Sequence, residues 1–366
     1  MVSREANIRG TPLNDEVIIV GGGLIGLAAA AALADRGVSS TVIGISKPGE
    51  ASPAAAGMLA PSVEQAEGAA HVFAVAARDR YPAYVEHLAE RTGVRVPLNR
   101  MGILQVAITE KGIKGLKKTA PPTAQWIEPE ELRKLEPALG HALGAMFNVG
   151  DGAVDNGILL TALRKLVASN EHITVVEGSV SKVAPRKESC DVILDDKSRR
   201  SAERVVLAAG AWVGKIAGAR FARAVKPARG QLVSYSSTPL RHVAYGPRGY
   251  VVPRSDRMIG GSTMEDVGFN PETTAVGIKK VRAAAEEICP VLESAGEVTV
   301  WAGLRPVTPD MLPIIGADPE YASLLYACGH SRNGVLMAPL TGDIIADLVT
   351  ASPLSHDLSQ FRPDRF

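Results

Sequence analysis

The expected fold follows from the stretch VIIVGGGLIG at residues 17–26. Its first four residues form an apolar run that suits a buried parallel strand, and its glycines match the pattern GxGxxG. An alanine-rich run at residues 25–36 predicts a helix, Gly37 is placed to end it, and residues 41–43 predict a second strand. Strand, glycine turn, helix and strand in this order are typical of a dinucleotide-binding unit.

Each glycine of this turn has its own expected task. Gly21 permits the tight turn, Gly23 lets a pyrophosphate approach the backbone, and Gly26 lets the helix pack close to the strand. The helix N-terminus, near Leu24 and Ile25, offers N–H groups and a partial positive charge to the phosphates. The alternative is a glycine-rich turn that binds no ligand.

An acidic residue that the fingerprint expects is missing. Asp or Glu normally stands about 20 residues after the turn and binds the ribose hydroxyls. Here residues 43–46 read IGIS, with Gly44 near that place, and the next acid is Glu50. Ser46 could donate a weaker hydrogen bond, or the ribose could meet backbone or water. The turn alone does not separate FAD from NAD(P), so an NAD(P)-dependent dehydrogenase and a non-catalytic nucleotide-binding protein both stay open.

Two later segments favour FAD. Residues 204–212 read as an apolar strand that ends in small residues, typical of a strand that passes close to FAD, although an ordinary core strand would look alike. Residues 324–328 read as another strand, residues 329–335 as a turn, and residues 336–350 as a buried helix. This second helix N-terminus could point at the flavin ring, where negative charge accumulates on reduction.

Five segments together resemble one family in order and spacing. They are GGGLIGL at 21–27, AAAGML at 54–59, GYVVPR at 249–254, WAGLRP at 301–306 and GHSRNG at 329–334. The chain resembles the glycine oxidase branch of the D-amino-acid oxidase family of FAD enzymes, the branch linked to thiamine biosynthesis. The resemblance implies an α/β fold, with a discontinuous Rossmann-like FAD-binding domain and a substrate domain built on a mainly antiparallel sheet.

The resemblance also implies roles for four residues of the active site. Arg305 matches the arginine that clamps the substrate carboxylate, and Tyr250 matches a tyrosine that helps to hold it. Met264 matches a methionine that lines the small pocket, and Arg332 matches an arginine beside substrate and flavin. The chemistry agrees, because a guanidinium is permanently charged and its fork fits a carboxylate. Taken alone, Arg305 could instead form a structural ion pair, and Tyr250 and Met264 could be core residues.

A larger set of residues is expected to hold the cofactor. The resemblance implies that residues 56–58 touch the isoalloxazine and that the backbone of Val180 meets the adenine. Residues 306–310 contain no cysteine for a covalent link, so we expect non-covalent FAD and a buried, inert Cys328. The expected cofactor-binding residues are Gly21, Gly23, Leu24, Ile25, Gly26, Ser46, Ala56, Gly57, Met58, Val180, Ala209, Gly210, Trp212, Arg332, Asn333, Gly334 and Val335.

The implied activity is oxidative deamination of a small amino acid, glycine first. Arg305 and Tyr250 would orient the substrate for hydride transfer to flavin N5, without a side-chain base. The products would be the 2-oxo acid, ammonia and hydrogen peroxide. A sarcosine oxidase, a broader D-amino-acid oxidase, or a dehydrogenase that passes electrons to a quinone are the alternatives within the family.

We expect the chain to be divided in an interleaved way. Residues 15–80, 148–225 and 310–360 are assigned to the FAD-binding domain, residues 81–147 and 226–309 to the substrate domain, and residues 1–14 to a flexible N-terminus. Alternating patterns in both substrate segments, at residues 103–107 and 231–235, indicate the antiparallel sheet.

Composition excludes several classes of protein. The 366 residues are 46% hydrophobic, which is enough for a sizeable core and excludes wholesale disorder. The 40 basic residues nearly balance the 39 acidic ones, so the net charge indicates no nucleic-acid or membrane-surface partner. Three scattered cysteines indicate neither disulfides nor a metal site and fit a cytoplasmic protein. Residues 17–34 resemble a signal peptide, but they fit strand, turn and helix better. The expected partners are a small amino acid and oxygen. Relatives are often homo-oligomers, but no interface is evident in the sequence.

Overall fold

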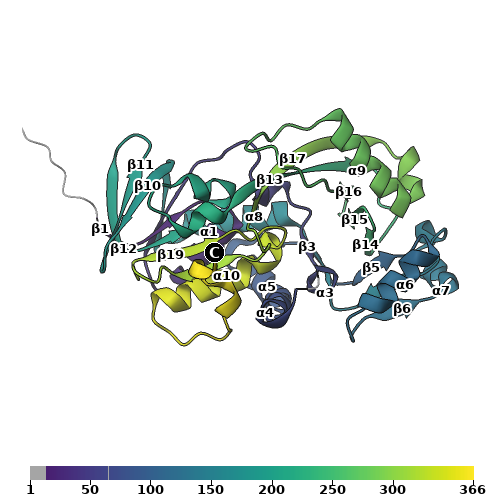
Figure 1. Cartoon of the computed structure of the whole chain (residues 1–366), viewed down its shortest axis with the longest axis horizontal. Coiled ribbons are helices and arrows are strands. Elements are labelled where there is room, and N and C mark those ends of the chain that lie inside the picture. The colour runs from purple at the N-terminus through teal and green to yellow at the C-terminus, as the bar shows by residue number, and fades with distance from the viewer. Residues whose placement is uncertain (1–13, 65) are drawn as a thin grey trace, which may run out of the picture.

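The computed structural model describes residues 14–64 and 66–366, and a mostly parallel sheet lies in one half of the molecule (Figure 1). The expectation for the N-terminus therefore lies almost wholly outside the described residues. The parallel strands are, in spatial order, β9 (Ile173–Glu177), β2 (Ser40–Gly44), β1 (Asn14–Val20), β12 (Arg199–Leu207) and β19 (Leu324–Cys328). Antiparallel β18 (Ile314–Ala317) pairs with β19, and the strands β10 (Val180–Pro185) and β11 (Cys190–Leu194) extend the sheet from the first half of β12.

Helices cover one face of this sheet. They are α1 (Leu24–Ala34), α4 (Gly68–Asp79), α5 (Tyr81–Thr92), α8 (Asn156–Ser169) and α10 (Gly334–Val349). Ten of the eleven residues of α1 are buried, as its apolar composition requires. Gly342 of α10 lets the two helices touch, because a Cβ there would lie 2.6 Å from the carbonyl oxygen of Ala28.

The second sheet is antiparallel except for the pairing of β14 with β5. Its strands are, in order, β17 (Glu297–Val307), β13 (Lys226–Tyr235), β16 (Met258–Gly261), β15 (Gly249–Pro253), β14 (Val243–Gly246), β5 (Ile103–Val106), β7 (Ala145–Asn148) and β6 (Gln125–Ile127). Helix α9 (Ala275–Ile288) packs on one face, while α6 (Glu110–Thr119) and α7 (Pro129–Leu135) lie near the β6 edge (Figure 1).

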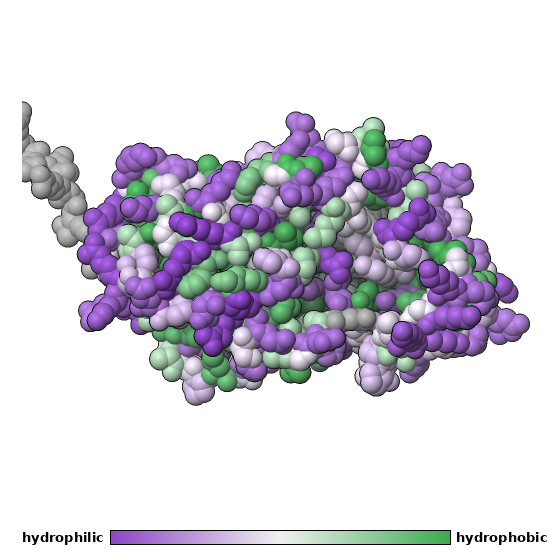
Figure 2. Space-filling view, in the orientation of Figure 1, coloured by the Kyte–Doolittle hydropathy of each residue, from purple (hydrophilic) through white to green (hydrophobic). Residues whose placement is uncertain are grey.

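Hydrophilic side chains cover much of the molecular surface that is visible in Figure 2, with apolar side chains in smaller groups between them.

The α/β class and the antiparallel second sheet are confirmed, and the packing of one helix bears on the expected division of the chain. Helix α5 begins just after residue 80, in the range that the sequence assigns to the substrate domain. Its Tyr81, Tyr84 and Leu88 instead join the core beneath the parallel sheet, because its apolar face meets α8. A small sheet of β3 (Met58–Leu59), β8 (Gly152–Val154) and β4 (Leu98–Asn99) lies between the larger units.

The three cysteines are buried and unbridged. Burial raises the pKa of the Cys328 thiol to about 12, so this thiol stays protonated near neutral pH. Across residues 14–64 and 66–366, no helix combines the length and the apolarity needed to cross a bilayer. The same ranges contain no cluster of His, Cys, Asp or Glu suited to a metal ion.

Candidate active site

A cavity of about 760 Å³ is lined by residues of both larger sheets. Its volume lies within the range of about 300–1,000 Å³ that is typical of small-molecule sites. The walls include the glycine turn after β1, the loop at residues 54–58, the ends of β12 and β19, and parts of β13, β15 and β17. All five segments that carry the family resemblance therefore contribute to one cavity.

Two glycines shape the turn at one end of the cavity. Gly21 has a φ of +122°, and a Cβ there would lie 2.3 Å from the carbonyl oxygen of Ala208. A Cβ on Gly26 would lie 1.9 Å from the carbonyl oxygen of Gly21. Side chains at either position would push β1, α1 and β12 apart. The N-terminus of α1 thus reaches the cavity wall.

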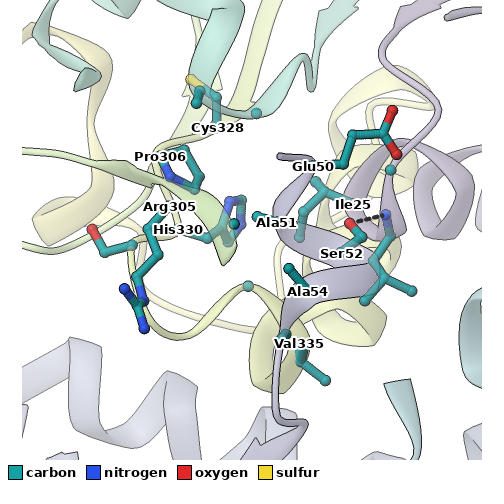
Figure 3. A pocket seen from close by; sticks show the side chains of 18 of the residues that line it. Ile25, Glu50, Ala51, Ser52, Ala54, Arg305, Pro306, Cys328, His330 and Val335 are labelled. Atoms are coloured by element: carbon teal, nitrogen blue, oxygen red, sulfur yellow. Dashed lines mark hydrogen bonds between the residues drawn. The ribbon is translucent and has the colours of Figure 1, made fainter. Parts of the chain in front are cut away.

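The N-terminus of α1 is capped from another part of the chain. Its own N-cap residue, Gly23, has no side chain, and the Leu24 N–H donates instead to the hydroxyl of Ser52, at 3.0 Å (Figure 3). Ser52 belongs to the short helix α2 (Ala51–Ala54), which leads into the loop at residues 54–58. The cap therefore ties the glycine turn, where we expect the phosphates, to the expected flavin-binding loop.

The end of β2 differs from the expected arrangement. A Cβ on Gly44 would lie only 2.8 Å from the backbone nitrogen of Gly22, so this place is narrow. Ser46 lines a small neighbouring cavity rather than the large one. Its assignment as a cofactor contact is therefore not supported by its position. Lys47 and Glu50 line both cavities, and the Glu50 carboxylate accepts from the Lys47 backbone N–H at 2.9 Å.

Arg254 holds the loop at residues 54–58 in place through a hydrogen bond to its backbone. Its side chain is only 7% exposed, and it donates to the carbonyl oxygen of Ala56 at 2.8 Å and to the amide oxygen of Asn156 at 2.9 Å. Burial lowers the pKa of Arg254, and the nearby carboxylate of Asp155 opposes this shift. Gly57, at a φ of +74°, brings the loop within reach of this arginine. The last residue of GYVVPR is therefore a structural anchor for AAAGML.

Arg305 lies at the other side of the pocket from Glu50 (Figure 3). It projects from β17 and donates to the carbonyl oxygen of Thr263 at 3.0 Å and to the hydroxyl of Ser262 at 2.6 Å. Both partners are neutral, so the guanidinium keeps its charge for an anion in the cavity. Gly230 on β13 makes room for it, since a Cβ there would lie 2.0 Å from Nη1 of Arg305.

Two tyrosines stack at the same end. Tyr250 on β15 and Tyr245 on β14 are directly opposite each other in the hairpin, and their ring centroids are 6.1 Å apart at 28°. The ring of Tyr250 fills the place that a side chain on Gly261 would need. Met264 also lines the cavity, but 52% of it is exposed, so it lies at the rim.

Arg332 follows β19 and is paired with an acid that the sequence did not single out. Its Nη2 donates to the carboxylate of Glu64, at the end of α3 (Pro61–Glu64). Both residues line the cavity. The pair leaves Arg332 electrically balanced, unlike Arg305.

His330 lies in the same turn but is fully enclosed. Its Nε2 lies 3.1 Å from the hydroxyl of Thr341, and burial lowers the pKa of the imidazole to about 3. This histidine is therefore neutral at physiological pH and brings no positive charge to the cavity.

The buried His330 should make the fold sensitive to acid. Its folded pKa lies below the unfolded value, so the stability it confers is complete above about pH 6.5 and is lost as the pH falls toward 3. In that window it should contribute up to about 1.4 kcal/mol per pH unit to the slope of the unfolding free energy. Denaturant titrations of wild type and His330→Gln at several pH values should show a shallower slope for the variant. Equal slopes would contradict this role.

Most of the expected site residues meet in the cavity. All four expected catalytic residues line it, as do the expected cofactor residues other than Gly26 and Ser46. Basic side chains outnumber acidic ones, which suits an anionic dinucleotide and a carboxylate substrate. The basic lining residues are Lys47, Lys215, Arg248, Arg305 and Arg332, and the acidic ones are Glu50, Glu64 and Asp195.

Fold and cavity together define a dinucleotide-binding protein whose second sheet adds an arginine-lined substrate end. The glycine turn, two helix N-termini and the surplus of basic groups fit a bound dinucleotide such as FAD. The model of the FAD dependent oxidoreductase family, DAO, matches residues 16–348. The chain belongs to this family of FAD-dependent oxidoreductases.

Similar proteins agree with this assignment. The chain is 35% identical over 364 residues to the bifunctional protein ThiO/ThiG of Synechocystis sp., across 96% of this chain and 54% of that protein. It thus spans about half the length of such relatives. It is also 35% identical to the glycine oxidase of Geobacillus kaustophilus, across 94% of this chain and 96% of that protein. The crystal structure of glycine oxidase from Geobacillus kaustophilus matches with a TM-score of 0.88 at 32% identity, across 97% of this chain and 100% of that one.

Proposed function

We propose that the protein is an FAD-dependent oxidase that oxidatively deaminates glycine or another small amine with one carboxylate. The observation that carries this proposal is Arg305, a cavity-lining cation whose partners within the described structure are neutral. An unpaired positive charge in a cavity favours an anionic ligand. The similarity to glycine oxidases supports glycine as the first substrate to test.

Each residue of the substrate end has a task in this proposal. Arg305 binds the substrate carboxylate through its fork, and Tyr250 packs beside it and limits the orientations that the substrate can adopt. The chemistry supplied by bound FAD is acceptance of a hydride from the carbon that bears the amine. The resulting imine is hydrolysed to the 2-oxo acid and ammonia, and oxygen takes the two electrons to form hydrogen peroxide.

The cofactor assignment extends to the rest of the cavity. Trp212 lines the cavity, with Nζ of Lys47 5.7 Å from its ring centroid. Lys47 and Glu50, rather than Ser46, are the polar side chains that line the cavity near the end of β2. We propose that FAD is held without a covalent bond, since Cys328 is buried and protonated.

We further propose the interleaved domain division, with α5 assigned to the FAD-binding unit. We also propose that the protein acts in the cytoplasm, in thiamine biosynthesis.

Stoichiometry and substrate range test the function. Purified protein should consume one oxygen per glycine and release one hydrogen peroxide and one ammonia. Sarcosine and D-alanine should be compared at the same concentrations. A faster rate with sarcosine would indicate a sarcosine oxidase, and a faster rate with D-alanine would indicate a broader D-amino-acid oxidase. Turnover that needs a quinone would replace the oxidase by a dehydrogenase, and turnover that needs NAD(P) would overturn the proposal.

A further inference from the structure

Arg305 and Arg332 both line the cavity, but their hydrogen-bond partners differ in charge. Arg305 is held by a backbone carbonyl and a hydroxyl, so its positive charge is not cancelled. Arg332 is bonded to the carboxylate of Glu64, and the Glu64 side chain is only 12% exposed. The substrate end therefore presents one net positive charge from two arginines.

The pair of Glu64 and Arg332 lines the same cavity as Arg305 and the two stacked tyrosines. Burial raises the pKa of the Tyr245 hydroxyl, the negative charge of Glu64 adds to this shift, and the positive charge of Arg332 opposes it. Tyr245 in turn stacks on Tyr250. Both members of the pair line the same cavity as Tyr245 and Tyr250, and their charges act on Tyr245.

We propose that Glu64 determines substrate specificity, by neutralising Arg332 and so excluding amines that carry a second carboxylate. This inference rests on the proposed function. A second carboxylate near Arg332 would meet the like charge of Glu64 or would have to displace it. A substrate with one carboxylate needs only Arg305. Glycine-like amines are therefore accepted, and dicarboxylic amines such as iminodiacetate are disfavoured.

The test is the variant Glu64→Gln, which keeps the size of the side chain and removes its charge. Two secondary amines of similar size report the effect: iminodiacetate, and N-ethylglycine, in which a methyl group replaces the second carboxylate. The ratio of kcat/KM for iminodiacetate to that for N-ethylglycine should rise roughly tenfold in the variant, as expected when an opposing charge is removed from a partly exposed site. The gain should shrink at high ionic strength.

A matched control comes from another arginine of the cavity. Arg248, in the turn between β14 and β15, donates to the carboxylate of Glu287 on α9 at 2.8 Å, and its side chain is 61% exposed. Glu287→Gln should leave the ratio unchanged. An equal or larger rise in this variant would assign the second carboxylate to Arg248 and overturn the role of Glu64.

Three further outcomes decide the matter. An unchanged ratio in Glu64→Gln, with glycine still oxidised, would overturn the inference and leave the proposed function intact. Wild-type protein that oxidises no small amine would instead overturn the proposed function. Should Glu64→Gln fail to fold, Arg332→Gln gives the same test with opposite sign: it exposes the charge of Glu64, so the ratio should fall, and a constant ratio would overturn the inference. The rates at which the two amines bleach the flavin in the absence of oxygen should change in the same order, because they report the reaction with the amine alone.

Discussion

Replacing Arg305 by alanine should lower kcat/KM for glycine by about 10²- to 10³-fold while the flavin stays bound. Removing one partner of an enclosed, charged hydrogen-bonded pair costs about 2–5 kcal/mol, and each ~1.4 kcal/mol is a factor of ten in rate. The flavin should stay because Arg305 lies away from the glycine turn, beside Ser262 and Thr263. Steady-state kinetics and the visible absorption of the purified variant measure both effects.

The control for this variant is Arg305→Lys. Lysine keeps the charge but loses the planar fork, so its kcat/KM should lie between those of wild type and the alanine variant. Unchanged kinetics in Arg305→Ala would contradict the carboxylate clamp. Loss of flavin in the same variant would show that Arg305 binds the cofactor rather than the substrate.

Replacing Gly21 by alanine should abolish tight flavin binding and lower the free energy of unfolding. The residue has a φ of +122°, which residues with a side chain rarely adopt, and the new Cβ would lie 2.3 Å from the carbonyl oxygen of Ala208, just after β12. Strain and overpacking each cost about 1–3 kcal/mol, so a loss of about 2–6 kcal/mol is expected. Denaturant unfolding and release of fluorescent flavin give the two readouts.

The neighbouring glycine supplies the matched control. A Cβ on Gly22 would have no atom within 4 Å, so Gly22→Ala should unfold at nearly the wild-type denaturant concentration. Tight flavin binding by Gly21→Ala would show that the turn does not need its glycine. An equal loss of stability in both variants would show that any side chain in this turn is harmful, and that the φ of Gly21 and its contact with Ala208 are not the cause.

Local sequence patterns predicted the parallel sheet well. The glycines at 21, 23 and 26 require a turn between strand and helix, and the structure places β1, α1 and β2 there within three residues of the expected ends. The sequence offered no reason to keep α4 and α5 together across residue 80, although they are consecutive helices with similar apolar faces. Only tertiary packing shows that both faces meet the same core.

The site was predictable to different degrees. Arg305, Tyr250 and Arg332 were found through the family resemblance, and their positions in one cavity need the folded chain. Tyr245 could have been found from the hairpin, since it is directly opposite Tyr250. Glu64 had no signal, because its contact with Arg332 joins residues 268 positions apart. Ser46 was chosen for its place in the sequence, and the chain turns its neighbours Lys47 and Glu50 toward the cavity instead.

The most direct test of the account is an anaerobic titration of the purified protein with glycine, followed by the visible flavin absorption. Bleaching by glycine that reverses when air is admitted is the predicted result, because it requires a bound flavin, a small amine donor and reoxidation by oxygen. A yellow protein that glycine, sarcosine and D-alanine all fail to bleach would contradict the proposed amine oxidation.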